Sequence, residues 1–349
     1  MQAKLHFIAR GAKLSKTAGV PPAPPEGSPQ ADAEKSQGKV YADLRQQVTD
    51  RIVAMLEKGS NVFRDRWSLA ACRGMPCNGK TGEPYHGVNV LLLWDAAIER
   101  GYSFNVWLTC RQAASLGGQV RKAEKGVMCV FFQPAPACAD APPQKRPVGK
   151  GGVLGSEEDN AGWRPTGGLI CKAFWVFNVA QIDGLPDAVS VTALTRHAST
   201  LSPVEAAESL LQRSGARFRH GFDQAFYAPS RDEIVLPHPA RFHSPENYYA
   251  TALHELVHWT GHPSRLARAF GRRFAHDAYA FEELIAELGS AFVMAHVGMV
   301  DATIEGHAGC LERWLSVLKR DRTAIFVAAR HAGLACEYLT GAWNRDTAL

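Results

Sequence analysis

The segment His254-Glu255-Leu256-Val257-His258 combines residues that can bind a metal ion with a residue that can move a proton. On a helix, residues four apart share one face, so both imidazoles can reach a single ion. Glu255, beside the first histidine, can take a proton from an attacking water. Because the flanking residues are strongly apolar, three buried polar side chains need a partner or a metal. We therefore expect His254 and His258 to hold a divalent ion and Glu255 to act as general base.

A metal site of this kind needs a third protein ligand, and residues 281–288 offer glutamates inside an apolar helix. Glu283 and Glu287 share a face, so one could ligate while the other orients a histidine from behind. The arrangement resembles gluzincin peptidases, in which a glutamate on a second helix completes the site and an acid four residues later lies behind it. The resemblance implies that Glu283 is the ligand and Glu287 the orienting residue. Glu282 is the alternative ligand.

Two other ligand arrangements fit the sequence less well. Metzincin spacing would require a histidine where Ser264 stands. His262 lies four residues beyond His258, but Gly261 and Pro263 should end the helix before it. Two imidazoles and a carboxylate favour Zn²⁺, although Mn²⁺ or another divalent ion could fill such a site.

A second set of residues indicates a nucleic-acid partner, because cations alternate with aromatic rings before residue 126. Single-strand binders use cations to follow phosphates and rings to stack on bases. Residues 1–133 carry 18 Lys and Arg against 11 Asp and Glu, whereas the remainder carries 21 against 23. Tyr85 should be the exposed ring, since it follows Gly82-Glu83-Pro84, while Trp94 and Phe131 are assigned to the core. The candidate DNA-binding residues are Arg64, Arg66, Trp67, Lys80, Tyr85, Trp107, Arg111, Arg121, Lys122 and Lys125.

The elements that must position these residues follow from hydrophobic periodicity, and they predict an α+β fold. Helices are expected over 40–56, 89–100, 109–117, 203–213, 245–260, 277–296, 308–319 and 322–339. Strands are expected over 127–132, 169–179, 217–220, 225–227 and 233–236. The strands 127–132 and 169–179 should form a hairpin that carries a disordered Pro/Gly-rich insertion, 134–167.

The chain divides, on this reading, into a disordered tail (1–38), an α+β domain (39–195) and a mainly helical domain (196–349). No uninterrupted apolar run of about 18 residues predicts a transmembrane helix, and the N-terminus does not resemble a secretory signal. The 8 cysteines include no C-x-x-C pair, which favours reduced thiols in a cytoplasmic protein. We expect no contact with membranes, since the chain has no apolar run of the required length.

Taken together, the motifs resemble the ArdC family of antirestriction proteins of conjugative plasmids, whose N-terminal domain is shared with TraC-type primases. The resemblance rests on residues 41–67, 78–89, 107–122, 254–266, 282–287 and 314–329. It implies a single-stranded-DNA-binding domain, a zincin-like metallopeptidase domain, and a role in protecting incoming plasmid DNA. One departure is Ala123, where the family usually has glycine in a Lys-Gly-Glu-Lys-Gly turn.

Two functions remain open at this point. In the first, the protein is a peptidase of unknown protein or peptide substrate, with Tyr279 or His276 as candidates to stabilise the oxyanion. In the second, it is a non-cleaving DNA shield, or a primase-associated conjugation protein, with a structural metal. A metal position open to solvent would favour the enzyme. The net charge of +5 excludes an acidic DNA mimic.

Overall fold

The computed structural model describes residues 44–57, 74–134, 169–187, 189, 201–269, 277–299, 302, 304 and 311–341. The predicted tail (1–38) and all of the insertion except Pro134 lie outside these residues, as do Arg64, Arg66, Trp67 and His276. The described elements mix helices and sheets, which confirms the α+β class. None of the described helices combines the length and hydrophobicity that a membrane span requires.

The N-terminal part builds a four-stranded sheet beside one buried helix, after a helical segment at residues 44–57. The elements are β1 (Cys77–Asn78), α3 (Val88–Glu99), β2 (Val106–Leu108), α4 (Cys110–Ser115), β3 (Gln119–Val120), β4 (Val127–Pro134), β5 (Leu169–Asn178), the 3-10 helix η1 (Val179–Gln181) and β6 (Ile182–Asp183). The sheet order is β1-β2-β5-β4, with β1 parallel to β2 and the other pairs antiparallel. β3 and β6 pair separately.

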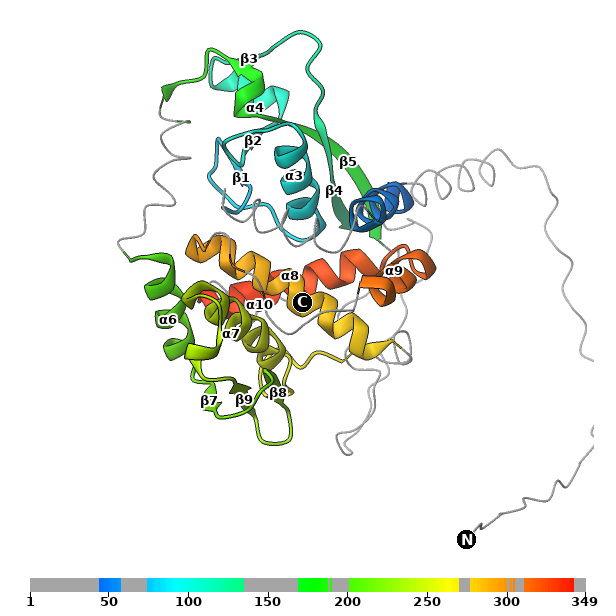
Figure 1. Cartoon of the computed structure of the whole chain (residues 1–349). Coiled ribbons are helices and arrows are strands. Elements are labelled where there is room, and N and C mark those ends of the chain that lie inside the picture. Colours follow the sequence, from blue (N-terminus) through cyan, green and yellow to red (C-terminus); the bar gives the residue numbers. More distant parts are fainter. Residues whose placement is uncertain are drawn as a thin grey trace, which may run out of the picture. The chain divides into compact units, whose positions relative to one another are not determined.

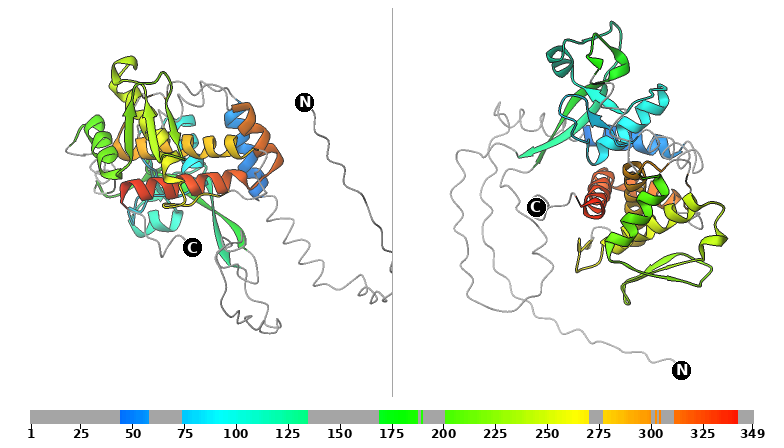
Figure 2. Two further views of the ribbon diagram at one scale, coloured as in Figure 1. Left: turned by 90° about the horizontal axis from the view of Figure 1, so that it is seen from below. Right: turned by 90° about the vertical axis from the view of Figure 1, so that its left-hand side faces the viewer.

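Local sequence signals account for two of these elements. Thr109 begins α4 as predicted, because its hydroxyl accepts a hydrogen bond from the Gln112 backbone at 3.2 Å, and the Gln112 side chain accepts one from the Thr109 backbone at 2.9 Å. The predicted hairpin is confirmed as well: β4 and β5 pair without interruption from Val127 opposite Val176 to Pro134 opposite Leu169. Both views in Figure 2 show this hairpin as a long two-stranded ribbon.

The C-terminal part is mainly helical and carries a small sheet, as the sequence predicts (Figure 1). Its elements are α6 (Pro203–Ser214), β7 (Arg217–His220), β8 (Phe226–Ala228), β9 (Glu233–Leu236), the 3-10 helix η2 (Pro239–Arg241), α7 (Pro245–Thr260), α8 (Ala278–Val297), α9 (Leu311–Arg320) and α10 (Ala324–Thr340). In the sheet, β9 lies in the centre, parallel to β7 and antiparallel to β8. β8 is therefore an edge strand.

Helix α8 lies at the centre of the hydrophobic core, in contact with both α7 and α10. The same core includes apolar residues of α3, and Trp94 of α3 packs edge-on against Phe292 of α8 with ring centroids 5.6 Å apart. Trp94 is fully buried, as expected. Because α8 is enclosed along most of its length, a carboxylate on its inner face has little access to water and needs a polar partner.

Gly289 allows α7 and α8 to approach closely. A Cβ atom at this position would lie 2.8 Å from Cγ1 and 3.1 Å from Cγ2 of Val257 on α7. Val257 is β-branched and has essentially one favoured rotamer in a helix, so it cannot turn away. The absence of a side chain at Gly289 is therefore a packing requirement of this helix pair.

We predict that Gly289→Ala destabilises the protein by up to about 2 kcal/mol, because overpacking costs about 1–3 kcal/mol and outweighs the roughly 1 kcal/mol that alanine gains in helix propensity. Gly333→Ala in α10 is the matched control, since no atom lies within 4 Å of the added Cβ. It should stabilise the protein by about 0.5–1 kcal/mol. Urea unfolding of both variants checks this, and equal stabilisation by the two would refute the packing argument.

Candidate functional site

Helix α7 presents its two histidines on one face because they are four residues apart on a continuous helix, whose first turn is fixed by a capping residue. Ser244 caps the first turn by accepting a hydrogen bond from the Asn247 backbone, and Pro245 occupies the first helical position. The helix then runs through Thr260, so His254 and His258 are separated by about one turn. Their rings meet edge-on with centroids 4.9 Å apart.

His254, His258 and Glu283 bring three ligand atoms together, as the sequence predicts. Nε2 of His254 lies 3.2 Å from Nε2 of His258, and each nitrogen lies 3.5 Å from a carboxylate oxygen of Glu283. A tetrahedral ion with ligands at about 2.0–2.1 Å separates those ligands by about 3.3–3.4 Å. The donor types and their spacing therefore suit one divalent ion.

Glu282 faces the opposite side of the His258 ring. Its Oε1 lies 3.3 Å from Nδ1 of His258, and it accepts hydrogen bonds from Arg268 at 2.5 Å and 3.2 Å. The alternative ligand of the sequence analysis thus occupies the position of an orienting residue. Glu287, which the resemblance to gluzincins assigns to orienting a histidine, lies one turn further along α8 and is half-buried. Its role remains a prediction.

Burial and ion pairing oppose each other in this cluster. Burial lowers the pKa of His258, but hydrogen bonds to Glu282 and Glu283 outweigh it and raise the pKa above its ordinary value. Burial alone would raise the pKa of Glu282. Hydrogen bonds with His258 and the charge of Arg268 instead hold this pKa below its usual range. His331 on α10 shows the effect of burial, which with the nearby charges of Arg268 and Arg330 lowers its pKa to about 4. Histidines in this region therefore differ in charge according to their partners.

A cavity of about 470 Å³ opens in front of these residues. Its lining includes Glu255, His258 and Glu283 of the two helices, Phe226 and Tyr227 of the edge strand β8, and Tyr279 at the start of α8. Glu255 is almost fully buried, whereas 65% of Tyr279 is exposed. Tyr279, one of the two residues proposed for the oxyanion, thus lies where it can contact a molecule in the cavity.

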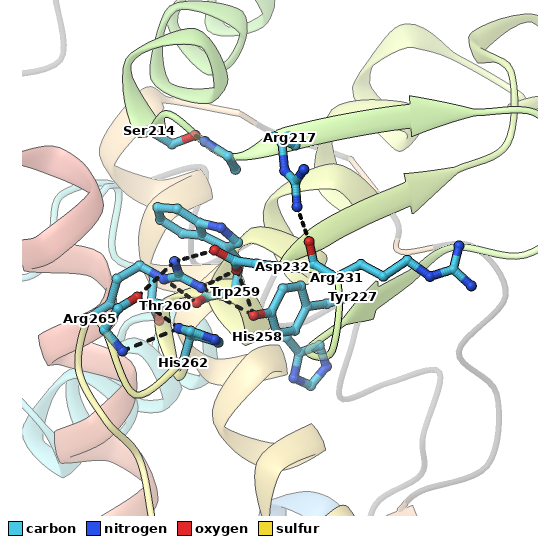
Figure 3. Close-up of polar contacts among 12 residues, drawn as sticks. Ser214, Arg217, Tyr227, Arg231, Asp232, His258, Trp259, Thr260, His262 and Arg265 are labelled. Atoms are coloured by element: carbon cyan, nitrogen blue, oxygen red, sulfur yellow. Dashed lines mark hydrogen bonds and ion pairs between the residues drawn. The ribbon is translucent and has the colours of Figure 1, made fainter.

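Arg265 holds the strand β8 against the end of α7 (Figure 3). Its guanidinium donates to both carboxylate oxygens of Asp232 at 2.6 Å and 3.0 Å and to the hydroxyl of Tyr227 at 3.1 Å. Its Nε donates to the carbonyl of Trp259 at 2.6 Å, and its Cζ lies 3.8 Å from the centre of the Trp259 ring. Tyr227 donates its own proton to Asp232 at 2.8 Å. The pocket wall is thus fixed to the histidine helix.

The pKa values of Asp232 and Tyr227 are also set by their hydrogen-bond partners and by burial. The hydrogen bonds from Arg265 lower the pKa of Asp232 to about 2, despite partial burial. Burial, and then the hydrogen bond to Asp232, raises the pKa of Tyr227 to about 12. Asp232 is consequently ionised, and Tyr227 protonated, throughout the neutral range.

The candidate DNA-binding cations that the structure describes are exposed: Lys80, Arg111, Arg121, Lys122 and Lys125. Two of them have partners. Arg121 pairs with Asp183 at 3.2 Å and with Glu124 at 2.9 Å, and Lys80 donates to Ser115 at 2.7 Å. In the described part of the chain, no ion pair involves Arg111, Lys122 or Lys125, which are thus available to phosphates.

The aromatic predictions need correction. Trp107 is fully buried and packs edge-on against Tyr102 with centroids 5.8 Å apart, so its ring cannot stack on a base. Tyr85 is half-buried against the same cluster, and burial raises its pKa above the ordinary value. For both rings, packing against apolar neighbours in the core is more favourable in free energy than exposure to solvent. Phe131, assigned to the core, is instead 43% exposed.

The sequence analysis did not identify Trp175, although 55% of its surface is exposed on β5. A Cβ atom added at Gly126 would lie 3.2 Å from Cβ of Trp175, which locates this residue beside the turn that contains Lys122 and Lys125. The turn forms even though Ala123 replaces the usual glycine, and Ala123 adopts a left-handed conformation with φ 67°. This conformation costs a non-glycine residue roughly 1–2 kcal/mol.

Comparison with known proteins agrees with this arrangement. Residues 42–177 match the N-terminal domain of anti-restriction factor ArdC, and residues 205–331 match the zincin-like metallopeptidase family. The metal-free crystal structure of the antirestriction ArdC protein from the R388 plasmid is 38% identical, with a TM-score of 0.65, over 87% of this chain and 100% of that one. The chain belongs to the ArdC antirestriction family. The Mn(II)-bound structure of the same ArdC protein is 36% identical, with a TM-score of 0.61, over 85% of this chain and 97% of that one.

Two relatives differ in how much of their own length this ArdC-family chain matches. It is 34% identical to the uncharacterized protein y4eC of Sinorhizobium fredii, over 85% of this chain and 91% of the relative. It is 37% identical to a DNA primase TraC of Escherichia coli over 84% of this chain, but that match spans 27% of the primase. The predicted domain boundary at 195–196 falls between the two family matches and remains a prediction.

We predict that the Asp232–Arg265 pair makes stability depend on acid pH. Because the pKa of Asp232 falls from 3.8 to about 2 on folding, its contribution is present above pH 3.8 and is lost as pH falls through about 2. The Asp232 side chain is 37% exposed, so solvent screening limits the contribution to about 1 kcal/mol. Asp232→Asn should therefore destabilise the protein at pH 7 and make no difference near pH 2.

Urea unfolding of the wild type and Asp232→Asn at several pH values measures this. Asp223→Asn is the control, because Asp223 pairs with Arg241 on the surface with 81% of its side chain exposed. It should have little effect at any pH. A loss for Asp232→Asn that stays constant from pH 7 to pH 2 would contradict the prediction.

Proposed function

We propose that this chain is a single-stranded-DNA-binding antirestriction protein whose C-terminal domain is a divalent-metal-dependent peptidase, and that it protects incoming plasmid or mobile-element DNA. The observation that carries the proposal is the triangle of His254, His258 and Glu283 ligand atoms beside Glu255 on an open cavity. Membership of the ArdC family supports the antirestriction role.

Zn²⁺ is the ion we propose first, because two imidazoles and one carboxylate form a common zinc ligand set. Mn²⁺ is the alternative, since a crystal structure of the ArdC protein from the R388 plasmid contains Mn(II). Either ion would supply Lewis acidity, which polarises a scissile carbonyl and makes a water more acidic.

The protein side chains would carry out the proton transfers. Glu255 would accept the proton of the attacking water and deliver it to the leaving amine. Glu282 would keep the proton of His258 on Nδ1, so that Nε2 presents a lone pair to the ion. Tyr279, largely exposed at the cavity, is the candidate to donate to the oxyanion.

The open cavity favours a peptidase over a purely structural metal site, because structural sites are closed by a fourth protein ligand. A non-cleaving alternative is nevertheless supported by the TraC primases, of which the chain matches only 27% and 19% of the length. In that case the two-domain unit would bind single strands for a primase. Only the peptidase alternative requires Glu255, so a variant at this residue distinguishes the two functions.

We predict that the purified protein binds one divalent ion per chain, and that His258→Ala and Glu283→Ala each weaken this binding by more than about 100-fold through loss of a ligand. His262→Ala is the control: His262 lines the same cavity, but its Nδ1 contacts Ser264 at 2.8 Å. Titration of the metal-free protein with Zn²⁺ against a chelator measures the affinities. Loss of binding in the control but not in Glu283→Ala would overturn the ligand set.

Glu255→Gln retains all three ligands, so it should bind the ion normally and lose any hydrolysis of a casein substrate. Retained antirestriction activity in cells that carry Glu255→Gln would favour the non-cleaving alternative.

For the DNA-binding domain, we propose that single strands lie across Trp175 and the turn containing Lys122 and Lys125. The ring can stack on bases of any type while the lysines contact phosphates. Trp175 thus takes the role that the sequence analysis gave to Trp107 and Tyr85. Arg111 and Lys80 remain candidates for further phosphate contacts.

We predict that Trp175→Ala weakens binding of oligo(dT) by about 1–3 kcal/mol and leaves the salt dependence unchanged, because stacking releases no counterions. Lys122→Ala should instead reduce the salt slope by about 0.7, the value for one phosphate of a single strand. Phe131→Ala is the control, since Phe131 is exposed on the same hairpin but on the opposite face in the strand register. Fluorescence anisotropy at several salt concentrations measures both effects. An equal loss in Trp175→Ala and Phe131→Ala would argue against a defined stacking position.

A further inference from the structure

We infer that Arg268 is a positioning residue for the metal centre: it locks the Glu282 carboxylate against Nδ1 of His258 and so fixes the ring that presents Nε2 to the ion. The inference rests on the proposed metal site. It assigns a role to a loop residue that lies ten positions after His258 and outside both helices that carry the ligands.

The contacts of Arg268 join the two ligand-bearing helices. On the α8 side, Nη2 and Nε donate to the two carboxylate oxygens of Glu282 at 2.5 Å and 3.2 Å. On the α7 side, Nη1 donates to the hydroxyl of Thr260 at 2.6 Å, and Nη2 donates to the carbonyl of Val257 at 2.7 Å. A planar guanidinium can satisfy these acceptors together, whereas an ammonium group cannot reproduce the fork.

Burial argues against a direct contact between Arg268 and a substrate. Although Arg268 borders the cavity, its side chain is 1% exposed, and nearly all its donors are engaged by Glu282 and the end of α7. Glu282, with 24% of its side chain exposed, is held from behind by this buried cation. Arg268 therefore acts through Glu282 rather than on a bound molecule.

Gly261 provides the space that Arg268 occupies. A Cβ atom at position 261 would lie 2.7 Å from Nη2 and 2.9 Å from Cζ of Arg268. The loop also returns to the helix end, because the Arg268 backbone donates to the Gly261 carbonyl at 3.0 Å. An alanine side chain at position 261 would push the guanidinium away from Glu282 without changing a charge.

These contacts have a chemical consequence for His258. With Glu282 fixed, its Oε1 accepts the Nδ1 proton of the imidazole, so the neutral ring carries its lone pair on Nε2, opposite His254 and Glu283. If Glu282 were free to rotate, both the tautomer and the orientation of the ring would vary. Metal affinity should fall although every ligand is still present.

The test compares the full-length wild type with Arg268→Lys, Glu282→Gln and Gly261→Ala, using Zn²⁺ in competition with a chelator, at a temperature where each metal-free variant is folded. We expect the dissociation constant to rise about 10–100-fold in all three variants. ¹H–¹⁵N NMR of the histidine rings in the zinc-loaded proteins should show a slowly exchanging Nδ1 proton on His258 in the wild type and a rapidly exchanging one in the variants.

Arg265→Lys is the matched control, because Arg265 is a buried arginine of the same loop that contacts Asp232 instead of Glu282. It should lower the melting temperature while leaving zinc affinity and the His258 signals unchanged. Equal zinc affinity in Arg268→Lys, Gly261→Ala and wild type would overturn the inference while leaving the proposed metal site intact. Absence of zinc binding by the wild type would instead overturn the metal site, and the inference with it.

Discussion

The close packing of α7 against α8 is the constraint on which the rest of the site depends. Both helices are largely apolar and buried, yet each turns charged or polar side chains toward the other: His254 and His258 from α7, and Glu283 from α8. Inside such an interface a polar group must find a partner. The short distance between the helices, which Gly289 permits, makes these side chains partners of one another.

Two arginines in the loop that follows α7 hold this helix pair in place, each through different contacts. Arg265 stacks on Trp259 and binds Asp232 and Tyr227, which connects α7 to the sheet that forms one wall of the cavity. Arg268 binds Glu282 and the last carbonyls of α7, which connects α7 to α8. The cavity wall and the ligand geometry are consequently held by neighbouring residues of one short segment.

Much of this could be predicted from the sequence, and the exceptions have physical reasons. Hydrophobic periodicity and capping residues predict α7, α8 and the β4–β5 hairpin, because these signals are local. Helical spacing also limits the third ligand to a few glutamates of α8, and the resemblance to gluzincins selects Glu283 among them. Arg268 carries no such signal, because its partners lie on separate elements and its position depends on how a loop folds back.

The aromatic residues show a second limit. Trp107 and Tyr85 lie near cations in the sequence, but nearness along the chain does not reveal which ring the core encloses. Trp175 has apolar or aromatic neighbours on both sides, so the alternation that would mark it as outward-facing is weak. Only the register of β4 and β5 shows on which face it lies.

That register also bears on how the chain can change in length. The last pair of the hairpin joins Pro134 to Leu169, so the two ends of the intervening segment are held side by side by main-chain pairing. The entropy of closing a loop grows only logarithmically with its length, by about 0.6 kcal/mol for each doubling. Insertions or deletions between these residues should therefore leave the sheet almost unaffected, which makes the hairpin tip a permissive position for evolutionary variation and for the attachment of tags or fused domains.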